Sequence, residues 1–289
     1  MRKIVLLATC AGLAAVAPAS AGDLVETGKA SVTLGWTSLD ESNDEGSNET
    51  DDQSYGLFGL DASYSIPLGP DWSLQADVLS EKFMVSGSAV NNVSNLMAGG
   101  LHVTYRKPEQ YAVGAFAGAG FGDTRREEDD YNAWWLGAEG QYYLSNTTLY
   151  GQLAYTAGDV EDTEEEFEGT WLLRGVVRHF LDDNSKVEGE LSYASADDAI
   201  DGDDEVNHLA WGLSYQRQLM DSRWYYTAGY RGGFVDTTTE GEELTDHTLY
   251  LKMSFQFDGL SLKANDRTGA SFDQPLTSLR ATGWLEPLD

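Results

Sequence analysis

Residues Leu249–Phe257 read LYLKMSFQF, a stretch in which apolar and polar side chains alternate without interruption. Successive side chains of a β-strand point to opposite faces of a sheet, so this period of two predicts a strand with one apolar and one polar face. The apolar face carries Leu249, Leu251, Met253, Phe255 and Phe257, and the polar face carries Tyr250, Lys252, Ser254 and Gln256. The stretch therefore predicts a strand that separates an apolar from a polar environment.

The same pattern recurs along the chain at intervals of about twenty residues. We expect strands over 29–37, 55–66, 71–83, 95–106, 110–121, 132–143, 148–157, 169–181, 186–195, 206–217, 223–234 and 247–257. The segment 110–121 is the weakest, because its period rests on Gly and Ala. The sequence therefore predicts twelve strands, with ten as the alternative.

The connections between these segments alternate between long and short. Those after the odd-numbered segments are long and mostly polar, whereas those after the even-numbered ones are tight, as at Pro67-Leu68-Gly69-Pro70. This asymmetry favours an all-β fold, a closed antiparallel up-and-down transmembrane β-barrel with long extracellular loops and short periplasmic turns. An even number of strands also places both termini on the periplasmic side.

The charge is strongly acidic and unevenly distributed. The formal net charge is −30, and thirty of the 48 acidic residues lie in the windows 39–53, 122–130, 159–168, 197–205 and 236–246. Such a chain is a poor nucleic-acid binder, and windows this charged are expected to be solvated loops. The loops could bind Ca²⁺ or Mg²⁺ weakly and bridge to lipopolysaccharide, or simply form a solvated rim. No specific metal site or other cofactor is predicted.

The amino terminus has the features of an export signal. Arg2 and Lys3 precede an apolar run too short to span a bilayer, and Ala19-Ser20-Ala21 is a cleavage pattern, so we expect a signal peptide over 1–21. A lipoprotein site at Cys10 is the alternative. Cys10 is the only cysteine, so a chain cut after Ala21 has no disulfides and no thiolate metal ligands.

Aromatic residues on the apolar faces gather near the ends of the segments. Trp134 and Tyr142 lie eight residues apart on one face, which in a tilted strand is roughly 20 Å, close to the ~25 Å between aromatic girdles. A secreted soluble sandwich with an aromatic core is the alternative.

As a pattern, residues 29–257 resemble bacterial outer-membrane β-barrels as a class, including porins, without a motif of one family. Leu249–Phe257 resembles the terminal signal that the barrel-assembly machinery recognises, with Phe255 and Phe257 as its assembly residues. The resemblance implies a Gram-negative outer membrane and contact with its lipid and lipopolysaccharide. The segment 258–289 departs from the pattern, since the signal often closes the chain. This tail could plug the lumen, lie in the periplasm or bind something there, and its apolar residues Leu276, Leu279, Trp284 and Leu285 argue against a purely floppy tail.

Charged residues on the polar faces are expected to line the lumen. The candidates for a constriction are Asp61, Asp77, Glu139, Arg174, Arg178, Glu188, Glu190, Arg223, Arg231 and Lys252. Arg174 and Arg178 are predicted to pair with Glu188 and Glu190 on the next strand. Alternatively, basic residues of 169–181, 223–234 and 247–257 face acids of 55–66, 71–83 and 132–143 across the pore and orient dipolar solutes.

The predicted function is a passive, porin-like channel for small solutes. The alternative is a structural or surface-interaction barrel closed by its tail. An outer-membrane hydrolase is the third class, with Asp246, His247 and Thr248, or His102 with Thr104, as the sets that could be drawn. Because no Gly-x-Ser-x-Gly or His-Glu-x-x-His motif is present, we predict no enzymatic activity.

Overall fold

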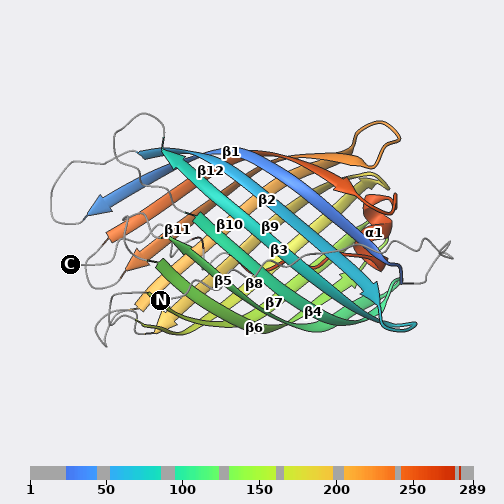
Figure 1. Ribbon diagram of the computed structural model, residues 1–289, viewed down its shortest axis with the longest axis horizontal. Coiled ribbons are helices and arrows are strands. Elements are labelled where there is room, and N and C mark those ends of the chain that lie inside the picture. The colour runs from blue at the N-terminus through green and yellow to red at the C-terminus, as the bar shows by residue number, and fades with distance from the viewer. Residues whose placement is uncertain are drawn as a thin grey trace, which may run out of the picture.

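The computed structural model describes residues 24–43, 53–85, 95–123, 130–160, 166–197, 205–237, 242–276 and 280. Over these residues twelve strands form one closed barrel (Figure 1). The strands are β1 (Thr27–Asn43), β2 (Gln53–Pro67), β3 (Trp72–Val85), β4 (Asn95–Lys107), β5 (Tyr111–Asp123), β6 (Asp130–Tyr143), β7 (Thr147–Val160), β8 (Glu166–Asp182), β9 (Ser185–Asp197), β10 (Glu205–Gln218), β11 (Trp224–Thr237) and β12 (Glu242–Gln256). The predicted signal peptide lies outside the described residues.

The strands pair antiparallel with their sequence neighbours, and β1 pairs with β12 to close the sheet. The closing register runs from Lys29 opposite Gln256 to Asn43 opposite Glu242. The weakly patterned segment is β5, which pairs with β4 and β6 along its full length. The prediction of a twelve-stranded up-and-down barrel is confirmed, and the ten-stranded alternative is wrong.

Most strands are longer than expected, and they extend mainly at the end with the long connections. β1 and β12 continue into two of the acidic windows, to Asn43 and Glu242, where we had expected loops only. At these ends the polarity of the two faces is reversed, because Leu39 and Leu244 are buried inside the barrel, whereas Asp40 and Glu243 are exposed. The hydrophobic period therefore marks the apolar belt of the barrel and misses the polar strand ends.

The apolar faces of the strands point outward. Leu34, Leu249 and Leu251 are 60%, 64% and 65% exposed, and large apolar residues of the other strands share their face. Aromatic rings form contacts along this face, with 5.9 Å between the ring centroids of Trp134 and Tyr155 and 5.4 Å between those of Tyr155 and Trp171. A soluble sandwich would bury these side chains, so that alternative is wrong, and the belt matches a hydrocarbon environment.

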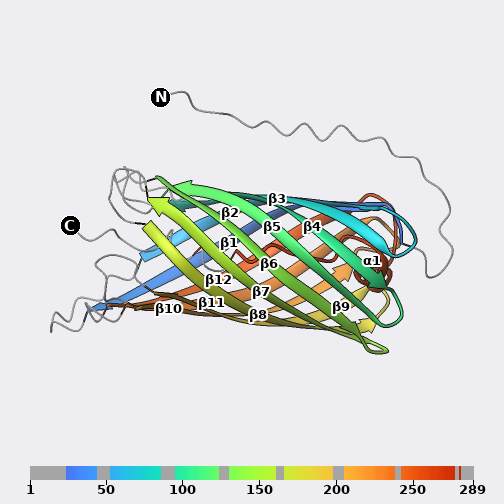
Figure 2. The same cartoon turned by 90° about the horizontal axis from the view of Figure 1, so that it is seen from below.

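The chain continues past β12 and turns back into the barrel. A short helix, α1 (Leu262–Thr268), lies at the end with the short turns, and the following residues run through the interior (Figure 2). Within the described ranges, no helix is long and apolar enough to cross a membrane. The lumen therefore holds a segment that belongs to no strand.

Candidate functional site: the barrel lumen and the C-terminal segment

Helix α1 is fixed to the short turns of the barrel. Ser261 caps its amino end by accepting a hydrogen bond from the backbone of Ala264, at 3.1 Å. Lys263 donates from Nζ to Asn146 at 2.8 Å, and Arg267 donates to the carbonyl of Ser145 at 2.9 Å. Both contacts are to the turn between β6 and β7, so the helix is held over the β6–β7 side of the lumen.

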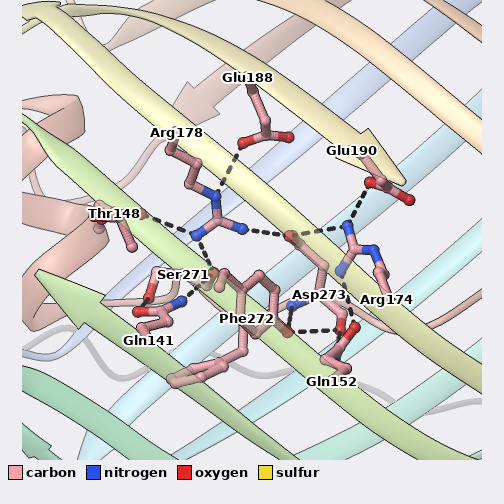
Figure 3. A network of polar contacts seen from close by, with 12 residues as sticks. Gln141, Thr148, Gln152, Arg174, Arg178, Glu188, Glu190, Ser271, Phe272 and Asp273 are labelled. Atoms are coloured by element: carbon pink, nitrogen blue, oxygen red, sulfur yellow. Dashed lines mark hydrogen bonds and ion pairs between the residues drawn. The ribbon is translucent and has the colours of Figure 1, made fainter. Parts of the chain in front are cut away.

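Arg178 of β8 is the centre of a buried polar network that joins the barrel wall to the C-terminal segment (Figure 3). Its guanidinium donates to Glu188 at 2.9 Å, to Asp266 at 2.9 Å and to Asp273 at 2.7 Å. It also donates to the carbonyl oxygen of Ser271 at 2.7 Å. Removing this guanidinium would leave the buried carboxylate of Asp266 without its ion-pair partner, so Arg178 holds the segment in place.

Asp273 is the acidic residue of the segment that meets the most basic side chains. Arg174 and Lys29 lie 3.8 Å and 3.9 Å from its carboxylate, in addition to Arg178. Burial favours the neutral form of Asp273, but Arg178, Lys29 and Arg174 outweigh it and hold the pKa of this carboxyl below its usual range. The carboxylate is therefore charged when the segment is docked.

Phe272 packs into an aromatic cluster on the wall formed by β4, β5 and β7. Its ring stacks on His102 with 5.9 Å between centroids, and His102 stacks in turn on Phe116 at 5.5 Å. Tyr150 meets Phe272 edge-on at 5.7 Å, and the Arg106 guanidinium lies 5.0 Å from its ring centre. This half of the lumen is packed like the core of a soluble protein.

His102 is fully buried between two acids. Its Nδ1 lies 2.7 Å from Glu139 and its Nε2 lies 2.9 Å from Asp77. The segment reaches the same site through Gln274, whose side-chain oxygen accepts a hydrogen bond from Trp135 at 2.7 Å. Glu139 and Asp77, two of the predicted constriction residues, therefore hold a histidine on which the segment packs.

Small inward residues make room for this packing. A Cβ at Gly100 would lie 2.2 Å from Gln274, and one at Gly118 would lie 2.5 Å from the Trp135 ring. Inward Gly and Ala residues of β4 and β5 leave space beside these strands. That space is filled by Trp135, Phe116 and the segment.

The opposite half of the lumen is hollow. A cavity of about 260 Å³ and a second of about 150 Å³ lie mainly against β9 to β12 and β1 to β3. The two cavities share the lining residues Lys29, Asp61, Glu188, Ser214, Tyr250, Lys252 and Asp273. They are therefore two parts of one hollow region that follows the C-terminal segment.

Ion pairs span this hollow region between strands that are not neighbours. Arg231 of β11 lies 3.1 Å from Glu81 of β3, and Lys252 of β12 lies 2.8 Å from Asp61 of β2. Arg280 of the C-terminal segment also binds Glu81, at 2.9 Å. Opposite charges thus face each other across the hollow half.

Nine of the ten candidate lumen residues lie on the inner side of the barrel. Arg174 pairs with Glu190 at 2.7 Å and Arg178 with Glu188, so the predicted cross-strand pairs are present. Arg223 was wrongly expected in the lumen. It precedes β11 in an exposed turn, where the alternation of a strand does not apply, and donates to the carbonyl of Phe257 at 2.8 Å.

The sequence analysis also missed several charged residues. These are Lys29, Glu81, Asp246, Asp266, Asp273 and Arg280. The period of two within the predicted strands 29–37 and 71–83 already places Lys29 and Glu81 inward, and extending the strand 247–257 by one residue adds Asp246. No periodic signal marks Asp266, Asp273 or Arg280, because they lie in a segment without a strand period.

The catalytic sets drawn from the sequence are not assembled. Asp246 and Thr248 face inward, whereas His247 faces outward and bonds Tyr230, at 2.7 Å. Thr104 bonds Ser73 at 2.6 Å and not His102. Among the described residues, no group of three or more His, Cys, Asp or Glu side chains is arranged to hold a metal ion.

Comparison with known proteins supports the fold. No family model and no curated protein matches the sequence. An outer-membrane channel from Pseudomonas putida F1 is similar in structure, with a TM-score of 0.54, 15% identity, and coverage of 84% of this chain and 100% of that one. The translocator domain of the autotransporter NalP from Neisseria meningitidis has a TM-score of 0.50 and 12% identity, covering 79% and 88%. The chain therefore has the fold of bacterial outer-membrane β-barrels, and its apolar belt places it in that membrane.

Proposed function

We propose that the protein is a channel of the outer membrane whose C-terminal segment narrows the lumen to a passage for small solutes. The observation that carries the proposal is the hollow region beside that segment, whose two cavities share seven lining residues. A barrel serving only as a structural element has no need of a continuous polar hollow. In the orientation we propose, the long connections are extracellular and the short turns periplasmic.

The dimensions favour small solutes. Twelve strands lie between the eight-stranded barrels that side chains fill and the open 16- to 18-stranded porins. Half of this intermediate lumen is packed by the C-terminal segment and its aromatic partners. The remaining cavities, of about 260 and 150 Å³, suit molecules of a few heavy atoms and exclude oligomers.

The lining favours polar solutes without a large net charge. Acids and bases alternate around the hollow, as in the pairs of Lys252 with Asp61 and Arg231 with Glu81. A permeating anion or cation meets charges of both signs within a few ångströms. We therefore propose weak ion selectivity, no enzymatic activity and no cofactor.

Further contacts of the protein follow from its surface. Phe255 and Phe257 at the end of β12 are proposed to be read by the barrel-assembly machinery. The acidic loops are proposed to face lipopolysaccharide, with weakly bound Ca²⁺ or Mg²⁺ between the two anionic surfaces.

Planar-bilayer conductance tests the proposal. The full chain is compared with a chain ending at Gly259, which keeps β12 and the contact of Asp258 with Gln256, at 2.7 Å. We expect small steps from the full chain and several-fold larger steps from the shortened one. Steps from the shortened chain alone would instead favour the barrel closed by its tail, and no steps from either folded chain would refute the channel.

A further inference from the structure

Among the described residues of the hollow half, the carboxylate of Asp246 and one ring nitrogen of His208 are unpaired, although almost every other charged group there is paired. The carboxylate of Asp246 makes no hydrogen bond or ion pair within the described part of the chain. His208 of β10 is 6% exposed, and its Nδ1 has no hydrogen-bond partner there. Leaving polar groups unpaired in a buried site is costly unless a ligand or water satisfies them.

The two groups converge over one residue of the strand between them. A Cβ built on Gly233 of β11 would lie 2.4 Å from Oδ1 of Asp246 and 3.0 Å from Nε2 of His208. Any other residue at position 233 would push both groups away. The glycine thus allows a carboxylate from β12 and an imidazole from β10 to meet at the wall of the larger cavity, which both groups line.

On the same cavity, two guanidinium groups share a single carboxylate. Glu81 accepts from Arg231 at 3.1 and 3.2 Å and from Arg280 at 2.9 and 2.9 Å. Each guanidinium has five N–H donors, so both retain donors after these bonds, and one positive charge is in excess. Arg231 and Arg280 also act electrostatically on Asp246, which places the surplus charge near the unpaired carboxylate.

We propose that this cavity binds a small zwitterion carrying one ammonium and one carboxylate group, of the size of an amino acid. The ammonium binds the unpaired carboxylate of Asp246, beside the imidazole of His208, and the carboxylate binds the remaining donors of Arg231 and Arg280. The inference rests on the proposed function in that the site lies on the proposed passage, and it names the class of solute.

Charge complementarity disfavours ligands that carry only one of the two groups. A plain anion bound to the arginines would lie near the unpaired Asp246 carboxylate, and a plain cation bound to Asp246 would lie near two guanidiniums. The volume, about 260 Å³, is below the roughly 300–1,000 Å³ of pockets for drug-sized ligands. Alanine carries both charged groups and is small enough for this volume.

The test measures binding of three matched probes to the full chain folded in detergent. Alanine carries both groups, propionate only the carboxylate and ethylammonium only the ammonium. Saturation-transfer NMR titrations give an apparent Kd for each. We expect alanine to bind at least about tenfold more tightly than either fragment, since each charged hydrogen bond contributes on the order of a tenfold factor.

Two variants with the same change of charge identify the site. Asp246→Asn is expected to weaken alanine binding about tenfold. Asp40→Asn, an exposed residue of β1 that does not line the cavity, is expected to change it less than twofold. His208→Gln is the second variant if Asp246→Asn does not fold. Equal binding of the three probes, or unchanged binding in the folded cavity variant, would overturn the site.

Conductance of the same preparation separates this inference from the proposed function. A conducting barrel that does not prefer alanine refutes the site and leaves the channel. A barrel that binds alanine selectively but does not conduct refutes the channel and leaves the site.

Discussion

The two halves of the lumen differ although one continuous sheet forms both. The wall of β4 to β8 is packed, with Phe272 of the C-terminal segment stacked on His102 and held by Arg178. The wall of β9 to β12 and β1 to β3 is hollow and lined by paired charges such as Lys252 with Asp61. The difference follows from side-chain size, because inward Gly and Ala on β4 and β5 admit the segment, whereas long charged side chains bridge the other half.

Replacing Arg178 is expected to have the largest effect on the difference between the packed and the hollow half of the lumen. Arg178→Met removes the ion-pair partner of the buried Asp266 and one of the partners of Glu188 and Asp273, which should destabilise docking by about 3–5 kcal/mol. The segment should leave the lumen, so single-channel conductance should rise toward that of the chain ending at Gly259. Arg223→Met, in an exposed turn, is the matched control, and conductance equal in both variants would contradict this role of Arg178.

Removing the aromatic anchor should have the next largest effect. Phe272→Ala deletes a buried ring that contacts His102 and Tyr150 and should weaken docking by about 3 kcal/mol. Limited trypsin digestion followed by mass spectrometry would detect the weaker docking as faster cleavage after Arg267. Phe121→Ala, which loses the same ring from the outer face, should leave the cleavage rate unchanged. Equal rates for Phe272→Ala and the parent chain would argue against a packed half.

A substitution in the hollow half should change selectivity and leave docking intact. Lys252→Gln leaves Asp61 without its partner at 2.8 Å, so the cation-to-anion permeability ratio should rise on the order of twofold. Reversal potentials in a salt gradient measure this ratio. A loss of docking, detected by faster trypsin cleavage, would show that the two halves are not independent.

Lowering the pH should weaken docking of the C-terminal segment, with the smallest effect of the four changes considered. Because docking lowers the pKa of Asp273, its contribution is complete above the ordinary carboxyl pKa of roughly 3.9 and declines as the pH falls below it. Asp266, Glu188 and Glu190 lie near the same arginines, so the response of the parent chain alone does not isolate Asp273. The informative quantity is therefore the change in conductance between pH 7 and pH 3 for the parent chain minus that for Asp273→Asn. A difference of zero would contradict the role of Asp273.

Local patterns in the sequence determined the barrel and the simplest part of its lumen. Alternation placed Leu249 and Leu251 outside and Lys252 inside, because successive strand side chains point to opposite faces whatever the distant contacts are. The pairs of Arg178 with Glu188 and Arg174 with Glu190 were also predictable, because hairpin register brings neighbouring strands together. The polar strand ends and Arg223 were misassigned where this period stops.

Only the tertiary structure decided what occupies the lumen. Arg178 meets Asp273, 95 residues away, and Arg231 meets Glu81, 150 residues away, across strands that do not pair. Such contacts depend on the closure of the barrel, its diameter and the path of a segment without a strand period. The sequence alone therefore determined which side chains face inward, because a period of two specifies a face of the sheet. The closed barrel decided which of these side chains meet, because that period carries no information about the opposite wall.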